Sequence, residues 1–142
     1  MATAKRIVVD TNLLVSRLLL PDSVPGQAVR KAEREGVVIA SRETLDELSD
    51  VLSRRKLDRY VDIEQRRKYV RRLLGTVEMV TARHVVRASR DASDDKFLEL
   101  ALSGGAALIL TGDTDLLTLN PFRGIAIQTA SDYLLACSTS RV

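Results

Sequence analysis

Short apolar runs alternate with longer amphipathic stretches along this chain. The apolar runs predict strands at residues 5–10, 37–40, 77–80, 107–110 and 125–128, and residues 84–86 are an alternative to the third. Between them, amphipathic stretches predict helices at residues 13–20, 42–54 and 94–103, the last two capped by Ser41 and Ser93. Two more helices are predicted from a Ser23 cap to Gly36 and from an Asp62 cap to Gly75. A helical turn is expected at 113–119, and a short last helix after a Ser131 cap.

This order of elements predicts an α/β fold with a central, mainly parallel sheet covered by helices on both faces. The 142 residues are enough for one domain, and we expect a single domain over residues 1–142. In such folds a ligand binds beyond the carboxyl ends of the strands, near the point where strand order reverses. The chemistry of the chain is therefore expected where the strands end.

Acidic residues stand at these strand ends and at a helix start. Asp10 ends the first apolar run, Asp94 and Asp95 open a helix, and Asp113 and Asp115 follow the fourth run. Each of these acids alone has an ordinary explanation as a helix cap, a partner of the helix dipole or a turn residue. Carboxylates that meet at one edge repel each other unless a cation lies among them, and oxygen ligands favour a hard cation such as Mg²⁺. The recurrence of acids therefore predicts a divalent-metal site and phosphate chemistry.

Glu47 is the candidate from the helix at 42–54, which carries four acids. At 100° per residue, Glu47 lies roughly 110° from the centre of the apolar face, at the border of the buried stripe. The other three, at about 150° or further, are expected to point outward: Glu43, Asp46 and Asp50.

The helix after Ser93 offers two neighbouring acids. Asp94 lies four residues before Leu98 and seven before Ala101, directly over the apolar stripe, so we expect Asp94 to be the metal ligand. Asp95 falls nearer the line of Glu99, which is expected to face outward. Asp95 is therefore predicted to stabilise the helix dipole or to support the ligands from a second layer.

The net charge of +3 hides an uneven distribution. Residues 54–72 contain nine basic and three acidic residues, a net +6, which leaves −3 for the rest of the chain. A basic segment beside an acidic site suits a polyanion such as RNA, although the same charges also fit a solvated helix surface or an acidic protein partner. The residues proposed to bind the RNA backbone are Arg54, Arg55, Arg66, Arg67 and Arg71.

Several other classes of protein are disfavoured. No run approaches the ~20 apolar residues of a membrane helix, and a first strand that begins at Lys5 leaves no room for a signal peptide. The single cysteine, Cys137, cannot form an internal disulfide, so a cytoplasmic location is expected. His84 is the only histidine, which excludes the two-histidine pair of a metal-independent ribonuclease.

Four segments together resemble the successive motifs of PIN domain nucleases, and are most similar to the VapC-like toxins of toxin–antitoxin pairs. They are residues 8–12, 45–48, 94–101 and 111–117. The resemblance implies a three-layer α/β/α sandwich and Mg²⁺- or Mn²⁺-dependent cleavage of RNA. It also implies a small antitoxin partner and a homodimer.

The resemblance implies roles for individual residues. The family's acidic positions fall on Asp10, Glu47, Asp94 and Asp113, with Asp115 as an accessory ligand, and its flanking polar positions fall on Thr11, Asn12 and Thr111, which would orient the carboxylates. Relatives often have Asp-Asn where this chain has Asp94-Asp95, so the motif does not settle which of the two is the ligand.

Two other functions compete with a metal-dependent endoribonuclease. A non-catalytic module that binds RNA or a partner could keep this fold, although such a module has no physical reason to keep mutually repelling acids. An aspartate-dependent phosphatase would use Asp10 as its nucleophile, but that chemistry usually needs an acid two residues on, where this chain has Asn12.

Overall fold

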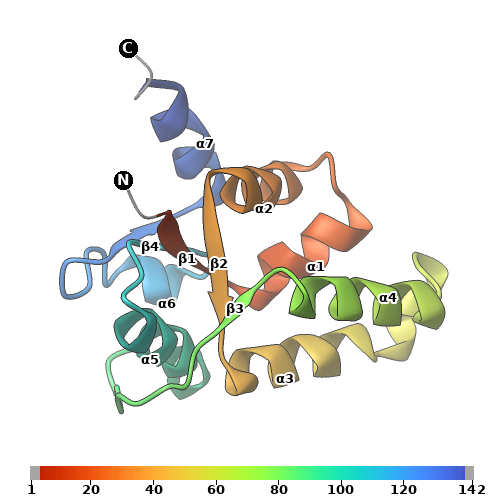
Figure 1. Ribbon diagram of the computed structural model, residues 1–142, viewed down its shortest axis with the longest axis horizontal. Coiled ribbons are helices and arrows are strands. Elements are labelled where there is room, and N and C mark those ends of the chain that lie inside the picture. The colour runs from red at the N-terminus through yellow and green to blue at the C-terminus, as the bar shows by residue number, and fades with distance from the viewer. Residues whose placement is uncertain (1–3, 140–142) are drawn as a thin grey trace.

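The computed structural model describes residues 4–139, and its centre is a sheet of five strands. All four neighbouring strand pairs are parallel, and the strand order is β3-β2-β1-β4-β5 (Figure 1). The strands are β1 (Lys5–Val9), β2 (Gly36–Ala40), β3 (Glu78–Met79), β4 (Leu108–Leu110) and β5 (Ala126–Gln128). The expected parallel sheet is confirmed, and the third strand is formed near residues 77–80, not at 84–86.

Helices cover both faces of this sheet, so the expected three-layer sandwich is also confirmed (Figure 1). One face carries α1 (Thr11–Leu19), α2 (Val24–Glu35), α3 (Arg42–Leu52), α4 (Ile63–Leu74) and α7 (Ala130–Thr139). The other face carries α5 (Asp95–Gly104) and α6 (Thr114–Leu117), and two 3₁₀ turns complete the chain: η1 (Arg55–Arg59) and η2 (Ala92–Asp94). Within the described residues, no helix is long and apolar enough to cross a membrane.

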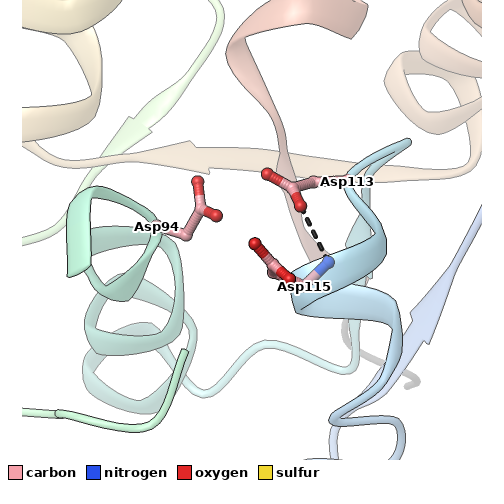
Figure 2. Close-up of side chains that lie close together, drawn as sticks. All are labelled: Asp94, Asp113 and Asp115. Carbon is pink, nitrogen blue, oxygen red and sulfur yellow. Dashed lines mark hydrogen bonds between the residues drawn. The ribbon is translucent and has the colours of Figure 1, made fainter. Parts of the chain in front are cut away.

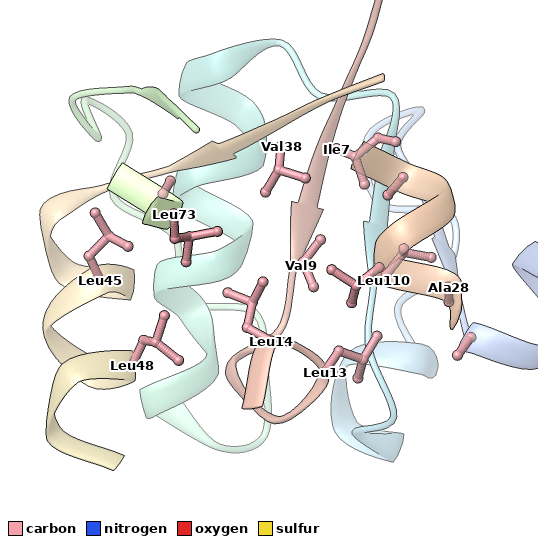
Figure 3. Packing of buried hydrophobic residues seen from close by; sticks show 14 of the residues in the cluster. Ile7, Val9, Leu13, Leu14, Ala28, Val38, Leu45, Leu48, Leu73 and Leu110 are labelled. Atoms are coloured by element: carbon pink, nitrogen blue, oxygen red, sulfur yellow. The ribbon is translucent and has the colours of Figure 1, made fainter. Parts of the chain in front are cut away.

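Alternate strand residues divide between two apolar cores. Ile7 and Val9 of β1 pack against the five-helix face (Figure 3), while Val8, between them, packs against α5 and α6. The same alternation continues in β4, where Ile109 lies in the second core. Apolar residues on both faces are what a central parallel strand needs, and they explain why these runs are continuous instead of alternating with polar residues.

Side-chain caps begin three of the helices as the sequence predicts. The Ser23 hydroxyl accepts the Gly26 backbone N–H, and the Asp62 carboxylate accepts the Gln65 backbone N–H. Ser41 and Thr44 form a reciprocal capping box at the start of α3. This box fixes the start of α3, and with it the position of the helix that carries Glu47.

Two expected caps are wrong. Ser93 does not cap α5; instead the Asp91 carboxylate accepts the Ser93 backbone N–H, and η2 precedes the α-helix, which begins at Asp95. At the end of the chain, the Thr129 hydroxyl, not that of Ser131, accepts an N–H of the first turn of α7. In both places two polar residues separated by one alanine compete for one cap, and the tertiary path of the chain decides between them.

Arg66 is a further correction. Its side chain is only 1% exposed, so it does not present a charge to RNA. The guanidinium donates to three backbone carbonyls, those of Leu52 (2.7 Å), Val61 (3.0 Å) and Arg54 (3.1 Å), and it pairs with Asp58. Arg66 therefore ties the end of α3 and the η1 turn to α4, and its five planar donors suit that structural purpose.

Replacing Arg66 by Met should lower the free energy of unfolding by about 3 kcal/mol, because it leaves buried carbonyls and the Asp58 carboxylate without a donor. Urea denaturation measures the loss. Arg67→Met, one position along α4 at a side chain that is 62% exposed, is the matched control and should change stability by no more than about 0.5 kcal/mol. Equal effects of the two substitutions would contradict the structural role of Arg66.

Candidate active site

The candidate site lies where strand order reverses, at the carboxyl ends of β1 and β4. The chain leaves β1 toward the five-helix face, whereas β4 is reached from α5 on the opposite face. The Asp10 backbone N–H donates to the Leu110 carbonyl at 2.9 Å, which extends the pairing of the two strands to their ends. Asp10 and Thr111, the first residues beyond β1 and β4, are consequently neighbours.

Three carboxylates approach one another most closely. Asp94, at the end of η2, faces Asp113 and Asp115 at the start of α6 (Figure 2), and one oxygen from each lies within 4.8 Å of the other two. Asp94 is buried, and the other two are half-buried. Parts of the chain about 20 residues apart therefore contribute to one group of oxygen ligands whose size suits a single metal ion.

The Thr111 hydroxyl joins this group to Asp10. It donates to Asp10 Oδ2 at 2.6 Å and accepts the Asp113 backbone N–H at 3.0 Å. Asp113 Oδ1 in turn accepts the Asp115 backbone N–H at 2.8 Å, which begins α6. A single buried threonine thus fixes the relative positions of the acids that follow the two central strands.

Asp10 occupies the N-cap position of α1, where its backbone carbonyl accepts the Leu13 and Leu14 N–H groups and its side chain is not a geometric cap. The residue is 8% exposed, and burial raises the pKa of its carboxyl; the Thr111 hydrogen bond opposes this rise, while the charges of Glu47 and Asp113 add to it. Asp10 therefore lies among the acids and interacts with them electrostatically.

Glu47 points from α3 into the same region and is held at both oxygens. The Thr11 hydroxyl donates to Oε2, and the Lys96 ammonium lies 2.8 Å from Oε1. Lys96 was not among the residues predicted from the sequence. Lys96 directly follows Asp94 and Asp95, and that position is the one sign in the sequence of a cation near the site. A lysine in the first turn of a helix is too common for this position alone to identify it.

Asp95 has a different environment from Asp94. Its Oδ1 accepts the backbone N–H groups of Ala88 and Ser89, at 3.2 and 2.8 Å. Glu99, one turn further on, accepts the Val86 N–H at 2.9 Å. The expected outward orientation of these two acids is therefore wrong: both hold residues 81–91, which we call the strap, across the side of α5.

The buried Asp94 carboxylate is the clearest indication of a ligand. Its Oδ2 is shielded from solvent and has no hydrogen-bond partner among the described residues. Burial raises the pKa of Asp94 to about 7, and the adjacent Asp113 carboxylate adds to the rise. A buried acceptor without a donor is costly, and a divalent cation would satisfy it and neutralise its neighbours. The residues present therefore fit a metal ion bound through oxygen.

The remaining predicted residues lie outside this cluster. Asn12 is exposed at the start of α1. Arg54, Arg55, Arg67 and Arg71 are exposed on the α3–α4 pair, whose connecting turn lies at the end remote from the sheet (Figure 1). These arginines are thus accessible to a large ligand, but Arg54 and Arg55 are not adjacent to the acids.

Comparison with known proteins gives one family. A family model described as a PIN domain matches residues 6–115. An uncharacterised protein from Methanocaldococcus jannaschii is 29% identical over 116 residues, which cover 80% of this chain and 74% of the relative.

Three solved structures share the fold. VapBC2 from Rickettsia felis, bound to a DNA fragment from its promoter, has a TM-score of 0.61 at 12% identity and covers 87% of this chain and 98% of its own. PAE2754 from Pyrobaculum aerophilum has a TM-score of 0.62 at 17% identity, and the match covers 95% of this chain and 90% of PAE2754. VapC20 from Mycobacterium tuberculosis, a sarcin–ricin loop cleaving toxin, has a TM-score of 0.55 at 17% identity, and the match covers 84% of this chain and 98% of VapC20.

The raised pKa of Asp94 predicts a pH-dependent stability in the absence of metal. Because the folded protein holds a proton on Asp94 up to about pH 7 and the unfolded chain loses it near pH 4, the folded state binds more protons in this range. Stability in EDTA should therefore fall as the pH rises from about 4.5 to 7.5. Urea denaturation across this range measures the fall.

Asp94→Asn should remove much of this pH dependence and make the metal-free protein more stable than wild type at pH 7.5. Asp46→Asn, at an exposed position of α3, is the control and should leave the slope unchanged. A wild-type stability that rises over this pH range would contradict the burial of a protonated Asp94.

Proposed function

Because the chain belongs to the PIN domain family, we propose that it is a metal-dependent endoribonuclease. The observation that carries this proposal is the group formed by Asp94, Asp113 and Asp115, in which one buried oxygen has no donor. The family match spans 6–115, and β5 and α7 pack into the same two cores as the matched elements, so we propose one nuclease domain over residues 1–142.

The proposed cofactor is Mg²⁺ or Mn²⁺, held by Asp94, Asp113 and Asp115 with Asp10 beside them. When bound, such an ion would lower the pKa of a water molecule and offset the negative charge that builds on the phosphate. Hard divalent cations prefer this all-oxygen donor set, and no imidazole or thiolate contributes to it among the described residues.

The chain's own residues hold the acids in place for this reaction. Thr111 keeps Asp10 and Asp113 at a fixed separation, while Thr11 and Lys96 restrain Glu47. Asp94, with its pKa of about 7, changes its protonation at neutral pH when the local charge changes. Rigid placement of the ligands before the substrate arrives is what makes electrostatic stabilisation effective.

We further propose that the protein acts as a toxin restrained by a small antitoxin. The support is its likeness in fold to VapBC2 and to VapC20, together with the half-exposed acids of the site. A partner that places a cation among these acids would silence the enzyme, because it would satisfy the same oxygens as the metal. An RNA substrate and such a partner both point to the cytoplasm as the place of action.

Purified protein should cleave RNA with Mg²⁺ or Mn²⁺ and lose this activity in EDTA. Asp10→Asn, Asp94→Asn and Asp113→Asn should each lower the single-turnover rate by at least ~10²-fold, because each removes charge that the metal site needs. Asp95→Asn is the matched control: its amide oxygen still accepts the two strap N–H groups, so it should keep much of the rate.

Cleavage that persists in EDTA, or a rate ranking in which Asp95→Asn is the most damaging, would contradict the proposed site. The same proteins test the toxin role: induced wild type should arrest growth, and Asp94→Asn should not. Harmless expression of a protein with demonstrated nuclease activity would remove the toxin role and leave the nuclease.

Arg67 and Arg71 are proposed to bind the RNA backbone, because both are exposed on α4. Arg67→Gln/Arg71→Gln should weaken binding of unrelated RNA sequences and flatten the log–log salt dependence by about 0.7 for each phosphate that the protein no longer neutralises. The measurement is RNA affinity in EDTA at several salt concentrations. The control, Arg30→Gln/Arg34→Gln on α2, removes the same charge elsewhere, and an equal effect would mean that only net charge matters.

A further inference from the structure

Lys96 is a cation beside Glu47, at the edge of the acidic site and two residues after the buried Asp94. Its side chain is only 19% exposed. The ammonium has three neighbours: Glu47 Oε1 at 2.8 Å, the Ser93 carbonyl, and the ring of Phe97, whose centroid is 5.3 Å away. A lysine held from three directions has given up the freedom that surface lysines usually keep.

Glu47 correspondingly has a protein donor at each of its two carboxylate oxygens. Thr11 donates to one and Lys96 to the other. By contrast, Asp94 Oδ2 has no donor, and the close group of metal-ligand oxygens consists of Asp94, Asp113 and Asp115, without Glu47.

We propose that Lys96 is a positioning residue that serves as the internal counter-ion of this cluster and competes with the divalent cation for Glu47. The proposal rests on the metal-dependent function proposed above. The ammonium supplies one positive charge to a group of four or five acids, enough to keep the cluster folded without metal but too little to satisfy Asp94. Glu47 is then held out of the metal's reach until the ammonium is displaced.

The competing explanation is a structural ion pair that merely joins α3 to α5. The two explanations differ in their effect on metal affinity. A structural pair, once removed, leaves the binding of Mn²⁺ unchanged or weakens it. Removal of a competing counter-ion strengthens the binding, because it releases the Glu47 carboxylate toward the metal.

Lys96→Met should therefore lower the Mn²⁺ dissociation constant about tenfold, because it releases the Glu47 carboxylate toward the ion. Isothermal titration of metal-free protein, without RNA, measures it. Glu47→Gln in the wild-type background should change the constant by less than about threefold. In the Lys96→Met background the same substitution should remove most of the gain, because the gain depends on a released Glu47.

Three further variants complete the experiment. Lys96→Arg keeps the charge and should keep the wild-type affinity, while Lys96→Gln should behave as Lys96→Met does and replaces it if the methionine variant fails to fold. Lys31→Met is the matched control: Lys31 is 14% exposed, pairs with Glu35 and lies 5.3 Å from the Tyr133 ring centroid, but on α2, away from the acids. Its affinity should equal that of wild type.

Unchanged or weaker Mn²⁺ binding by both neutral variants would overturn the role of Lys96 and leave the metal-dependent nuclease intact. Failure of the wild-type protein to bind Mn²⁺ at all would overturn both the role of Lys96 and the metal-dependent nuclease. The titration of the wild-type protein therefore distinguishes failure of the nuclease proposal from failure of the Lys96 proposal alone. A gain that survives Glu47→Gln in the double variant would show that Lys96 acts on the metal through charge alone and would overturn the competition for Glu47.

Discussion

The mutual repulsion of carboxylates buried at one edge of a parallel sheet is the constraint on which this structure depends. Parallel pairing of β1 with β4 makes Asp10 a neighbour of the turn that carries Asp113, and burial removes the water that would otherwise screen them. The fold tolerates this arrangement through three features: the Thr111 hydroxyl, the raised pKa of Asp94, and the Lys96 ammonium beside Glu47. Each of these compensates only in part, which supports the proposal that the site binds a cation.

Such a cluster needs a rigid support, and the two apolar cores provide it. Ile7 and Val9 anchor β1 on one side and Val8 on the other, so the strand that ends in Asp10 is fixed from both faces. The strap contributes from a third direction, because Val86 is 3% exposed and packs into the second core while Asp95 and Glu99 hold its backbone. The neighbouring acids Asp94, at the end of η2, and Asp95, at the start of α5, thus have separate purposes, one toward the site and one toward the strap.

The environments of these residues explain which parts of the structure could be predicted from the sequence. Continuous apolar runs identified the strands and their parallel sheet because burial on both faces leaves a direct compositional mark. The placement of Asp10 and Asp113 just past the ends of β1 and β4 was expected from the geometry of parallel strands, although the assignment of metal ligands stays a prediction. Asp95 and Glu99 were misplaced because helical periodicity assumes that the face opposite the core meets water, whereas here a loop without regular structure covers it.

The cations show most clearly why composition alone does not reveal function. Arg66 and Arg67 are adjacent in a basic run, yet the first is 1% exposed and holds backbone carbonyls, while the second is 62% exposed. Lys96 lies outside that run and is the cation that contacts Glu47. The free energy of a charge depends on its desolvation and its nearest partners, which vary from one residue to the next along a helix. A count of charges therefore predicts the class of ligand, whereas only the tertiary contacts determine which cation serves the site.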